Sequence, residues 1–133
     1  MAVPMEINSI VPGDPGAGID KTQSALIVEG SLTLSGTYGG ASPAHGDAID
    51  FKDARITSSS IPRRVEIFQY PAIGIQPAPY TFYYAYGDDQ SDGELVVIST
   101  VTGLELTQGS AYPGQLIAAY AGIRFRATFP LGV

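Results

Sequence analysis

The only histidine in the chain is His45, in the stretch Ser42-Pro-Ala-His-Gly-Asp47. A hydrolytic triad would need this imidazole beside a serine nucleophile and an orienting carboxylate. The sequence has no Gly-x-Ser-x-Gly motif that would present such a serine. A loop histidine without these companions is typical of a surface residue, and we assign no catalytic role to it.

The densest acidic stretch is Asp88-Asp-Gln-Ser-Asp-Gly-Glu94. Oxygen ligands at alternate positions followed by glycine resemble the start of a calcium loop. The twelfth position is Ser99, where such a loop needs a bidentate glutamate, so we interpret the stretch as a solvated hairpin turn. Asp47, Asp50 and Asp53 recur every three residues, a spacing that does not place all three on one strand face. We therefore predict a protein that is not an enzyme, with no catalytic, metal-binding or cofactor-binding residue and no cofactor.

Four aromatic residues alternate along one stretch, at Tyr80, Phe82, Tyr84 and Tyr86. On a strand they would share one face, and two interpretations follow. An exposed row would make a flat platform for stacking on sugar rings, whereas a buried row would supply large apolar area to the core. We favour the core interpretation and keep a carbohydrate-binding module as an alternative function.

The composition limits the class of partner. The chain has 133 residues, a length typical of one domain, with a net charge of −6 and only 15% charged residues. The negative charge argues against binding nucleic acid, because that affinity comes mainly from neutralised phosphates. No run approaches the roughly 20 apolar residues of a membrane helix, and the first residues do not resemble a signal peptide. The chain has no cysteine, which fits a reducing cytoplasm. A surface this poor in charge suggests contact with other proteins.

The supporting elements are strands. Residues 1–23 contain three prolines and form, in our interpretation, an extended arm that lies along the body or reaches a neighbour, with a disordered tail as the alternative. Residues 24–133 form the single β domain. Its organising stretch is Ala25–Phe51, where apolar and polar residues alternate up to the loop at Gly36–Gly40. Gly30 interrupts the apolar row and indicates a bulge or a close backbone approach.

Further strands are expected over 48–54, 63–70, 80–86 and 94–101, with a long last strand over 117–129. The acidic turn between 80–86 and 94–101 predicts a hairpin. Only 102–109 has room for a single helical turn. With seven or eight strands, the fold class is all-β, an antiparallel β-sandwich or jelly-roll-like small barrel.

The layout resembles that of small structural proteins of tailed bacteriophages. Those proteins have a strand running into a Tyr-(Pro/Gly)-Gly-Gly turn, here Tyr38-Gly39-Gly40, a Tyr-rich central hairpin, here Tyr80–Val101, and an apolar, Ala/Arg-rich last strand, here Ala118–Phe129. The resemblance implies a capsid decoration or cement protein that clamps the major capsid protein on the outer capsid surface of the virion. It also implies assembly in the bacterial host cytoplasm, a homo-oligomer (dimer or trimer), and neither a nucleic-acid nor a membrane partner. Another phage part, a head–tail or tail-tube component, is a further alternative.

For this function the expected contact regions are the arm 1–23, the Gly-rich loop 36–46 and the Pro-rich loop 71–79. The pair Arg63-Arg64, together with Arg124 and Arg126, is expected to bind acidic groups of a partner. The candidate partner-binding residues are Pro4, Ile7, Ile10, Pro12, Tyr38, Gly39, Gly40, Ile73, Ile75, Tyr84, Arg124 and Arg126.

Overall fold

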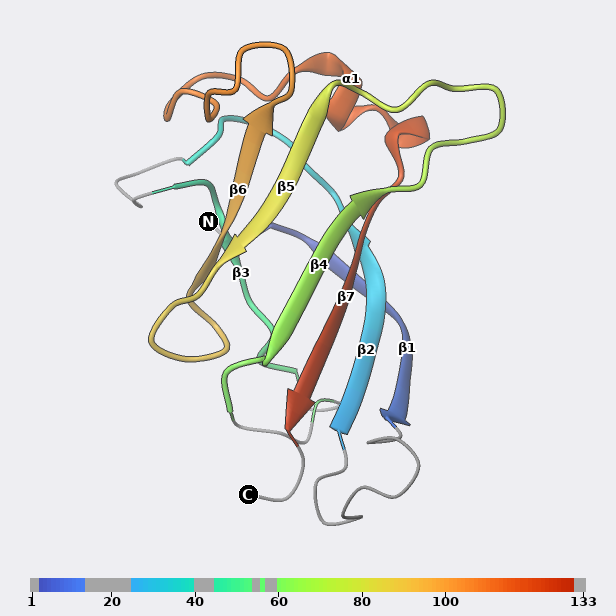
Figure 1. The fold of residues 1–133 in the computed structure, drawn as a ribbon, viewed down its shortest axis with the longest axis vertical. Helices are drawn as coiled ribbons and strands as arrows, with labels where there is room; N and C mark the ends of the chain where they lie inside the picture. The colour runs from blue at the N-terminus through green and yellow to red at the C-terminus, as the bar shows by residue number, and fades with distance from the viewer. Residues whose placement is uncertain (1–2, 14–24, 40–44, 54–55, 57–59, 131–133) are drawn as a thin grey trace.

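The computed structural model describes residues 3–13, 25–39, 45–53, 56 and 60–130, and Figure 1 shows their arrangement. Seven strands lie within these residues: β1 (Met5–Gly13), β2 (Ala25–Leu32), β3 (Ala48–Ile49), β4 (Arg64–Gln69), β5 (Tyr80–Ala85), β6 (Gly93–Ser99) and β7 (Ile123–Pro130). They form a four-stranded sheet in the order β1-β2-β7-β4 and a three-stranded sheet in the order β3-β6-β5. Every strand pair is antiparallel. The predicted all-β, sandwich-like fold is confirmed.

The alternation along β2 decides which side of the large sheet is buried. Leu26, Val28 and Leu32 are buried, while Glu29 between them is exposed. In the neighbouring strand β7 the residues opposite Leu26 and Val28 are Phe129 and Ala127, and both are fully buried. Because side chains alternate across a strand, this register turns both apolar rows toward the same core.

Gly30 is the point where β1, β2 and β7 come closest. The β1 register shifts between Ile7 and Ser9, opposite Gly30, so a bulge lies in β1 at this level. A β-carbon on Gly30 would collide with the backbone oxygen of Glu6 and with the ring of Phe125. The glycine thus marks both features that its place in the apolar row predicted, a bulge and a close approach.

Phe51 joins the two sheets at the centre of the core. Its fully buried ring lies 5.5 Å from the ring of Phe125 and 5.4 Å from that of Phe129, both on β7. On its other side it lies 5.8 Å from the ring of Tyr84 on β5. Such edge and tilted contacts are the favoured geometries of aromatic pairs. One aromatic cluster therefore serves both sheets.

The sheets meet differently at their two sides. On one side the Val3 N–H donates to the Ala48 oxygen at 2.8 Å, which links the start of the chain to β3. On the other side β4 and β5 lie next to each other without a strand ladder between them, and side chains fasten this seam. The Tyr86 hydroxyl donates to the Arg63 oxygen at 2.9 Å, and Gln69 bonds the backbone of the segment that enters β5. The fold is an open sandwich and not a closed barrel.

The predicted last strand starts later than expected. Residues 114–121 form a short helix, α1 (Gly114–Ile117), and a 3₁₀ turn, η2 (Ala119–Ala121), before β7 begins. Pro113 precedes α1, a position that suits its fixed φ. Gly122 then ends η2 with a left-handed φ of 61°. No helix forms over 102–109, where the chain returns along β6 as an irregular hairpin.

The N-terminal arm is partly a strand of the body. Met5–Gly13 pairs with β2 along its whole length as the edge strand of the large sheet. Ile7 and Ile10 are half-buried and pack against the core. Of the two positions expected for the arm, this part occupies the one along the body; residues 1–2 and 14–23 lie outside the described residues.

Candidate functional site

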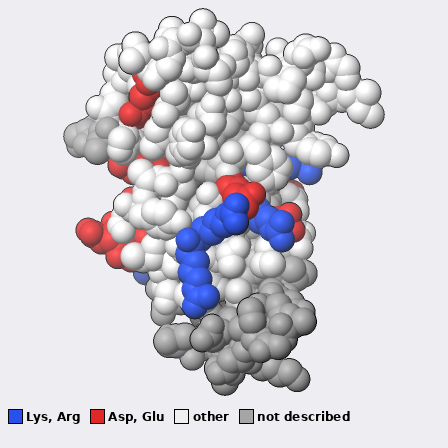
Figure 2. Space-filling model, viewed as in Figure 1, with Lys and Arg blue, Asp and Glu red and all other residues white. Residues whose placement is uncertain are grey.

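One end of the sandwich is formed by three segments that carry almost no charge. They are the loop 71–79 between β4 and β5, the turn 100–104 after β6, and the α1–η2 segment. Residues 70–80 contain no charged side chain, and residues 99–123 contain only Glu105. Figure 2 shows this end nearly free of colour, while charged side chains cross the middle of the view. We call these three segments the uncharged end.

The uncharged end also exposes large apolar side chains. Ile73, at the tip of its loop, is fully exposed, and the Val101 and Leu104 side chains are 79% and 69% exposed. The remaining exposed apolar residues of the three segments are Ile75, Ile117 and Tyr120. Single exposed apolar residues are ordinary, but a group of them on a surface without charge marks an interaction site.

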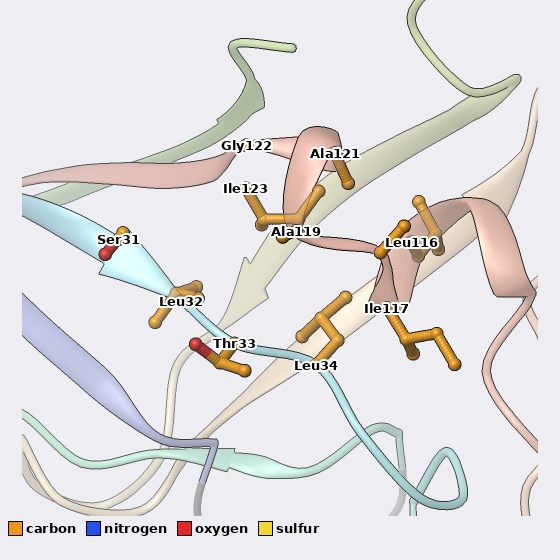
Figure 3. A pocket seen from close by; sticks show the side chains of 11 residues that line it. Ser31, Leu32, Thr33, Leu34, Leu116, Ile117, Ala119, Ala121, Gly122 and Ile123 are labelled. Atoms are coloured by element: carbon orange, nitrogen blue, oxygen red, sulfur yellow. The ribbon is translucent and has the colours of Figure 1, made fainter. Parts of the chain in front are cut away.

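A hollow of about 340 Å³ lies between the end of β2 and the α1–η2 segment (Figure 3). It forms because β2 and the residues after it run past the point where β7 begins, so that the helical segment takes the place of a neighbouring strand. Leu34 and Ile117 line it from opposite sides. The polar side chains that line it are those of Ser31 and Thr33, which are hydroxyls. The hollow therefore suits an uncharged, mainly apolar group.

A second hollow, of about 210 Å³, lies under the loop 71–79 on the other side of η2. Its walls include Pro71, Pro77 and Tyr120, and its polar side chains, apart from the Tyr120 hydroxyl, are glutamine amides. One of these amides, Gln69, fixes the loop. Its side-chain nitrogen donates to the Ala78 oxygen at 2.9 Å, and its oxygen accepts the Ala78 N–H at 2.8 Å.

Beside the uncharged end, a polar cluster surrounds the one carboxylate in residues 99–123. The Tyr38 hydroxyl donates to Glu105 at 2.5 Å, and His45 Nδ1 lies 3.1 Å from the same carboxylate. The Tyr112 hydroxyl donates to Asp47 at 2.9 Å, and the Tyr38 and Tyr112 rings pack edge to face at 5.7 Å. The carboxylates of Glu105 and Asp47 are thus both engaged with tyrosine hydroxyls.

Burial, together with these carboxylate partners, raises the pKa of Tyr38 and of Tyr112 well above the ordinary tyrosine value. Both tyrosines consequently stay neutral hydrogen-bond donors across the physiological range. His45 has a carboxylate neighbour, yet the described residues place no serine hydroxyl against its ring. The cluster ties His45 to the residues that return along β6.

The acidic stretch 88–94 is the turn between β5 and β6, as the hairpin interpretation predicted. Its carboxylates stabilise the turn itself: Asp92 accepts the Asp89 N–H at 2.9 Å, and Asp89 accepts the backbone and hydroxyl donors of Ser91. These bonds from Ser91 hold the pKa of the Asp89 carboxyl below its usual range. Across the part of the chain that the structure describes, no three acidic or histidine side chains are grouped to hold a metal ion.

The aromatic row on β5 faces the core. Phe82 and Tyr84 are buried, Tyr80 packs partly against the core, and Tyr86 at the strand end is exposed. The core interpretation is confirmed for Phe82 and Tyr84. The four rings of this row therefore do not form a flat, exposed platform on the strand.

The predicted contact residues fall into different environments. Tyr38, Gly39 and Tyr84 are buried, so they support the core and offer no surface to a partner. Pro4 is exposed beside β1, and Pro12 lies within β1. Those on exposed surface in the rest of the fold are Ile73, Ile75, Arg124 and Arg126. Gly40 lies outside the described residues.

Sequence reasoning found only one of the three segments of the uncharged end. The loop 71–79 was a candidate because of its prolines. The sequence prediction places Val101 at the end of the strand 94–101 and Leu104 in the segment 102–109. It places Ile117 and Tyr120 in the last strand, 117–129. The feature of the sequence that points to the other two segments is the low charge of residues 99–123, which they share with residues 70–80.

Comparison with known proteins found no match for this chain among family models, curated proteins or solved structures. No helix in the described ranges is both long and apolar enough to span a bilayer.

Proposed function

We propose that this chain is a structural protein without enzymatic activity that attaches to a protein assembly through its uncharged end. The observation that carries the proposal is the presence of six exposed large apolar side chains on three segments that contain no charged residue. The neighbouring Glu105 carboxylate already accepts the Tyr38 hydroxyl. Placing a charged partner surface on this end would remove charges from water without compensation. A neutral, apolar partner surface would bury apolar area at no such cost.

We further propose that the assembly is the outer surface of a tailed-phage head, with the major capsid protein as the partner. The resemblance in layout and the polar, charge-poor composition support this choice. On an icosahedral shell, many weak contacts arranged by symmetry give a large total affinity. A homo-oligomer placed on a symmetry axis would present several uncharged ends at once.

Co-sedimentation with purified, expanded heads of tailed bacteriophages tests the proposal. We expect the wild-type chain to pellet with heads and the double variant Ile73→Asp/Leu104→Asp to stay in the supernatant, because each substitution places a charge on the contact surface. Lys52→Glu is the matched control, since the change from a positive to a negative side chain lowers the net charge by the same amount at an exposed position. Lys52 lies near Asp89 of the β5–β6 turn, at the end of these strands opposite to the uncharged end. Light scattering after size-exclusion chromatography gives the oligomeric state of all three proteins.

Equal pelleting of the double variant and the wild type would remove the uncharged end from the proposal. Failure of the wild-type chain to pellet with any head preparation would remove the capsid as the partner. Loss of pelleting with Lys52→Glu as well would show that net charge, and not the position of the charge, governs attachment.

A further inference from the structure

The outward face of the large sheet differs from the uncharged end in that it carries charged and polar side chains. They lie in rows that run across the strands. In one row Glu29 of β2, Arg126 of β7 and Glu66 of β4 stand directly opposite one another. In the next row Ser31, Arg124 and Phe68 occupy the same three strands. Figure 2 shows the resulting band of charged side chains across the middle of the molecule.

The two arginines of β7 therefore have different neighbours. Arg126 stands between two carboxylates, and opposite charges at directly opposed positions stabilise a sheet. Arg124 stands between a hydroxyl and an aromatic ring. Among the described residues no carboxylate lies within ion-pair distance of Arg124. Within the described residues Arg126 has no carboxylate within ion-pair distance either, and Glu66 makes its ion pair with Arg64 at 3.0 Å. The two arginines differ in register: Arg126 has carboxylate residues directly opposite it on both sides, and Arg124 has none.

Arg124 is also held in place. Its guanidinium carbon lies 4.5 Å from the centre of the Tyr70 ring, a cation–π contact that leaves the N–H groups of the fork available. Tyr70 and the neighbouring Phe68 are 62% and 38% exposed. A positioned guanidinium beside exposed aromatic surface loses little side-chain entropy when it binds a carboxylate.

A hollow of about 210 Å³ opens next to this guanidinium. It lies against the β1 bulge, where Asn8 and Ser9 provide neutral hydrogen-bonding groups, and Phe68 forms an apolar wall. Glu29, which stands opposite Arg126 in the register, also borders the hollow. The hollow is thus lined by one guanidinium, one carboxylate, an apolar wall and neutral polar groups.

We infer that Arg124 anchors a carboxylate of a partner protein, in a segment where an acidic residue is followed by an apolar one. The carboxylate would accept from the Arg124 fork, and the apolar side chain would cover Phe68 and Tyr70. Charge complementarity favours this occupant, because Arg124 is the only cation among the described residues that line the hollow and the register places no carboxylate directly opposite it. A nucleic acid fits less well, since a continuous line of phosphates would meet Glu29 and Glu66 and the overall negative charge.

The site is tested on the ¹⁵N-labelled full chain by NMR titration at low salt with the peptide acetyl-Glu-Leu-Glu-Leu-amide. We expect shifts of the Arg124 Nε–H and of the backbone amides of Phe68 and Asn8. Arg124→Gln should weaken binding about tenfold, the typical value of a charge-assisted hydrogen bond. Arg126→Gln is the matched control on the same strand and should change the affinity less than about twofold.

Two comparisons separate this site from general charge attraction. The neutral peptide acetyl-Gln-Leu-Gln-Leu-amide should give no saturable shifts, and an oligothymidylate of the same charge should bind more weakly than the acidic peptide. Equal losses in Arg124→Gln and Arg126→Gln, or equal binding of the neutral peptide, would overturn the assignment. Tighter binding of the oligothymidylate would overturn the choice of a protein partner. Because the titration does not involve the uncharged end, its failure leaves the proposed attachment to heads unaffected, and the reverse also holds.

Discussion

Gly30 shows how a single missing side chain sets the spacing of three strands. A β-carbon on this residue would collide with the β1 backbone at the Glu6 oxygen and with the Phe125 ring. We expect Gly30→Ala to lower the free energy of unfolding by about 1–3 kcal/mol, the usual cost of overpacking a core. Urea denaturation measures the loss. Gly114→Ala is the control, since a β-carbon there meets nothing within 4 Å, and unchanged stability of Gly30→Ala would contradict the account.

Tyr84 makes the stability sensitive to alkaline pH. Burial raises its pKa from 10.0 to about 12, and the pKa values of Tyr38 and Tyr112 are raised as well. Because the pKa is raised on folding, these tyrosines ionise at lower pH in the unfolded chain than in the folded protein. Their full contribution to the free energy of unfolding is therefore present below about pH 10. That contribution is lost as pH rises, for Tyr84 between about 10 and 12.

Urea midpoints at about pH 8 and about pH 11 test this prediction. The Tyr84 hydroxyl has no hydrogen-bond partner among the described residues. Tyr84→Phe should therefore be at least as stable as the wild type at the lower pH and should lose less stability at the higher one. Tyr83→Phe, on the exposed face of the same strand, is the control. An identical pH dependence of Tyr84→Phe and wild type would refute the role of this hydroxyl.

At the scale of elements, β4 and β5 depend on Gln69 where a strand ladder is missing. This side chain bonds the Ala78 N–H, the Ala78 oxygen and the Tyr80 oxygen. We expect Gln69→Ala to speed hydrogen exchange of the Ala78 amide by about tenfold, which corresponds to the loss of one hydrogen bond of roughly 1.4 kcal/mol. Gln76→Ala, in the same loop and exposed, should leave that amide unchanged. Equal protection of Ala78 in both variants would argue against the role of Gln69 in fastening the seam.

The same elements show what a sequence can and cannot reveal. The aromatic composition and the acidic turn identified the β5–β6 hairpin, and alternation identified β2, which has one buried face. Alternation failed at the start of β7, since Ile117, Ala119 and Ala121 continue the apolar parity of the strand by coincidence. The backbone there is set by Pro113 before the helix and by Gly122 after it, which act locally and are invisible to a period-two pattern.

The candidate site was harder to predict than the fold, for a related reason. Tyr38 sits in a glycine-rich stretch typical of a surface loop, yet its ring is fully buried and its hydroxyl bonds Glu105, 67 residues away. Likewise, the three segments of the uncharged end come together only through the sheet order. Local composition marks a loop as charge-poor but does not show which distant loops lie beside it. Arg124 and Arg126 look equivalent in sequence, and only the cross-strand register separates them.

At the scale of the whole molecule, the two sheets should unfold as one unit because they share the Phe51 cluster. Phe51 contacts rings of both sheets, and the link between Val3 and Ala48 closes only one side. Phe51→Ala should lower the free energy of unfolding by about 3–5 kcal/mol, as expected for a buried aromatic residue. Phe68→Ala, which truncates an exposed ring on β4, should cost far less.

The mode of unfolding distinguishes a shared core from two separately stable sheets. In the wild type, tyrosine fluorescence and far-UV circular dichroism should report the same single urea transition. In Phe51→Ala the transition should move to lower urea and stay single, because neither sheet retains a core of its own. Two separated transitions in that variant would show that the four-stranded sheet is stable without β3, β5 and β6. In that case the uncharged end, whose segments connect strands of both sheets, should unfold before the outward face of the large sheet that carries Arg124 and Arg126.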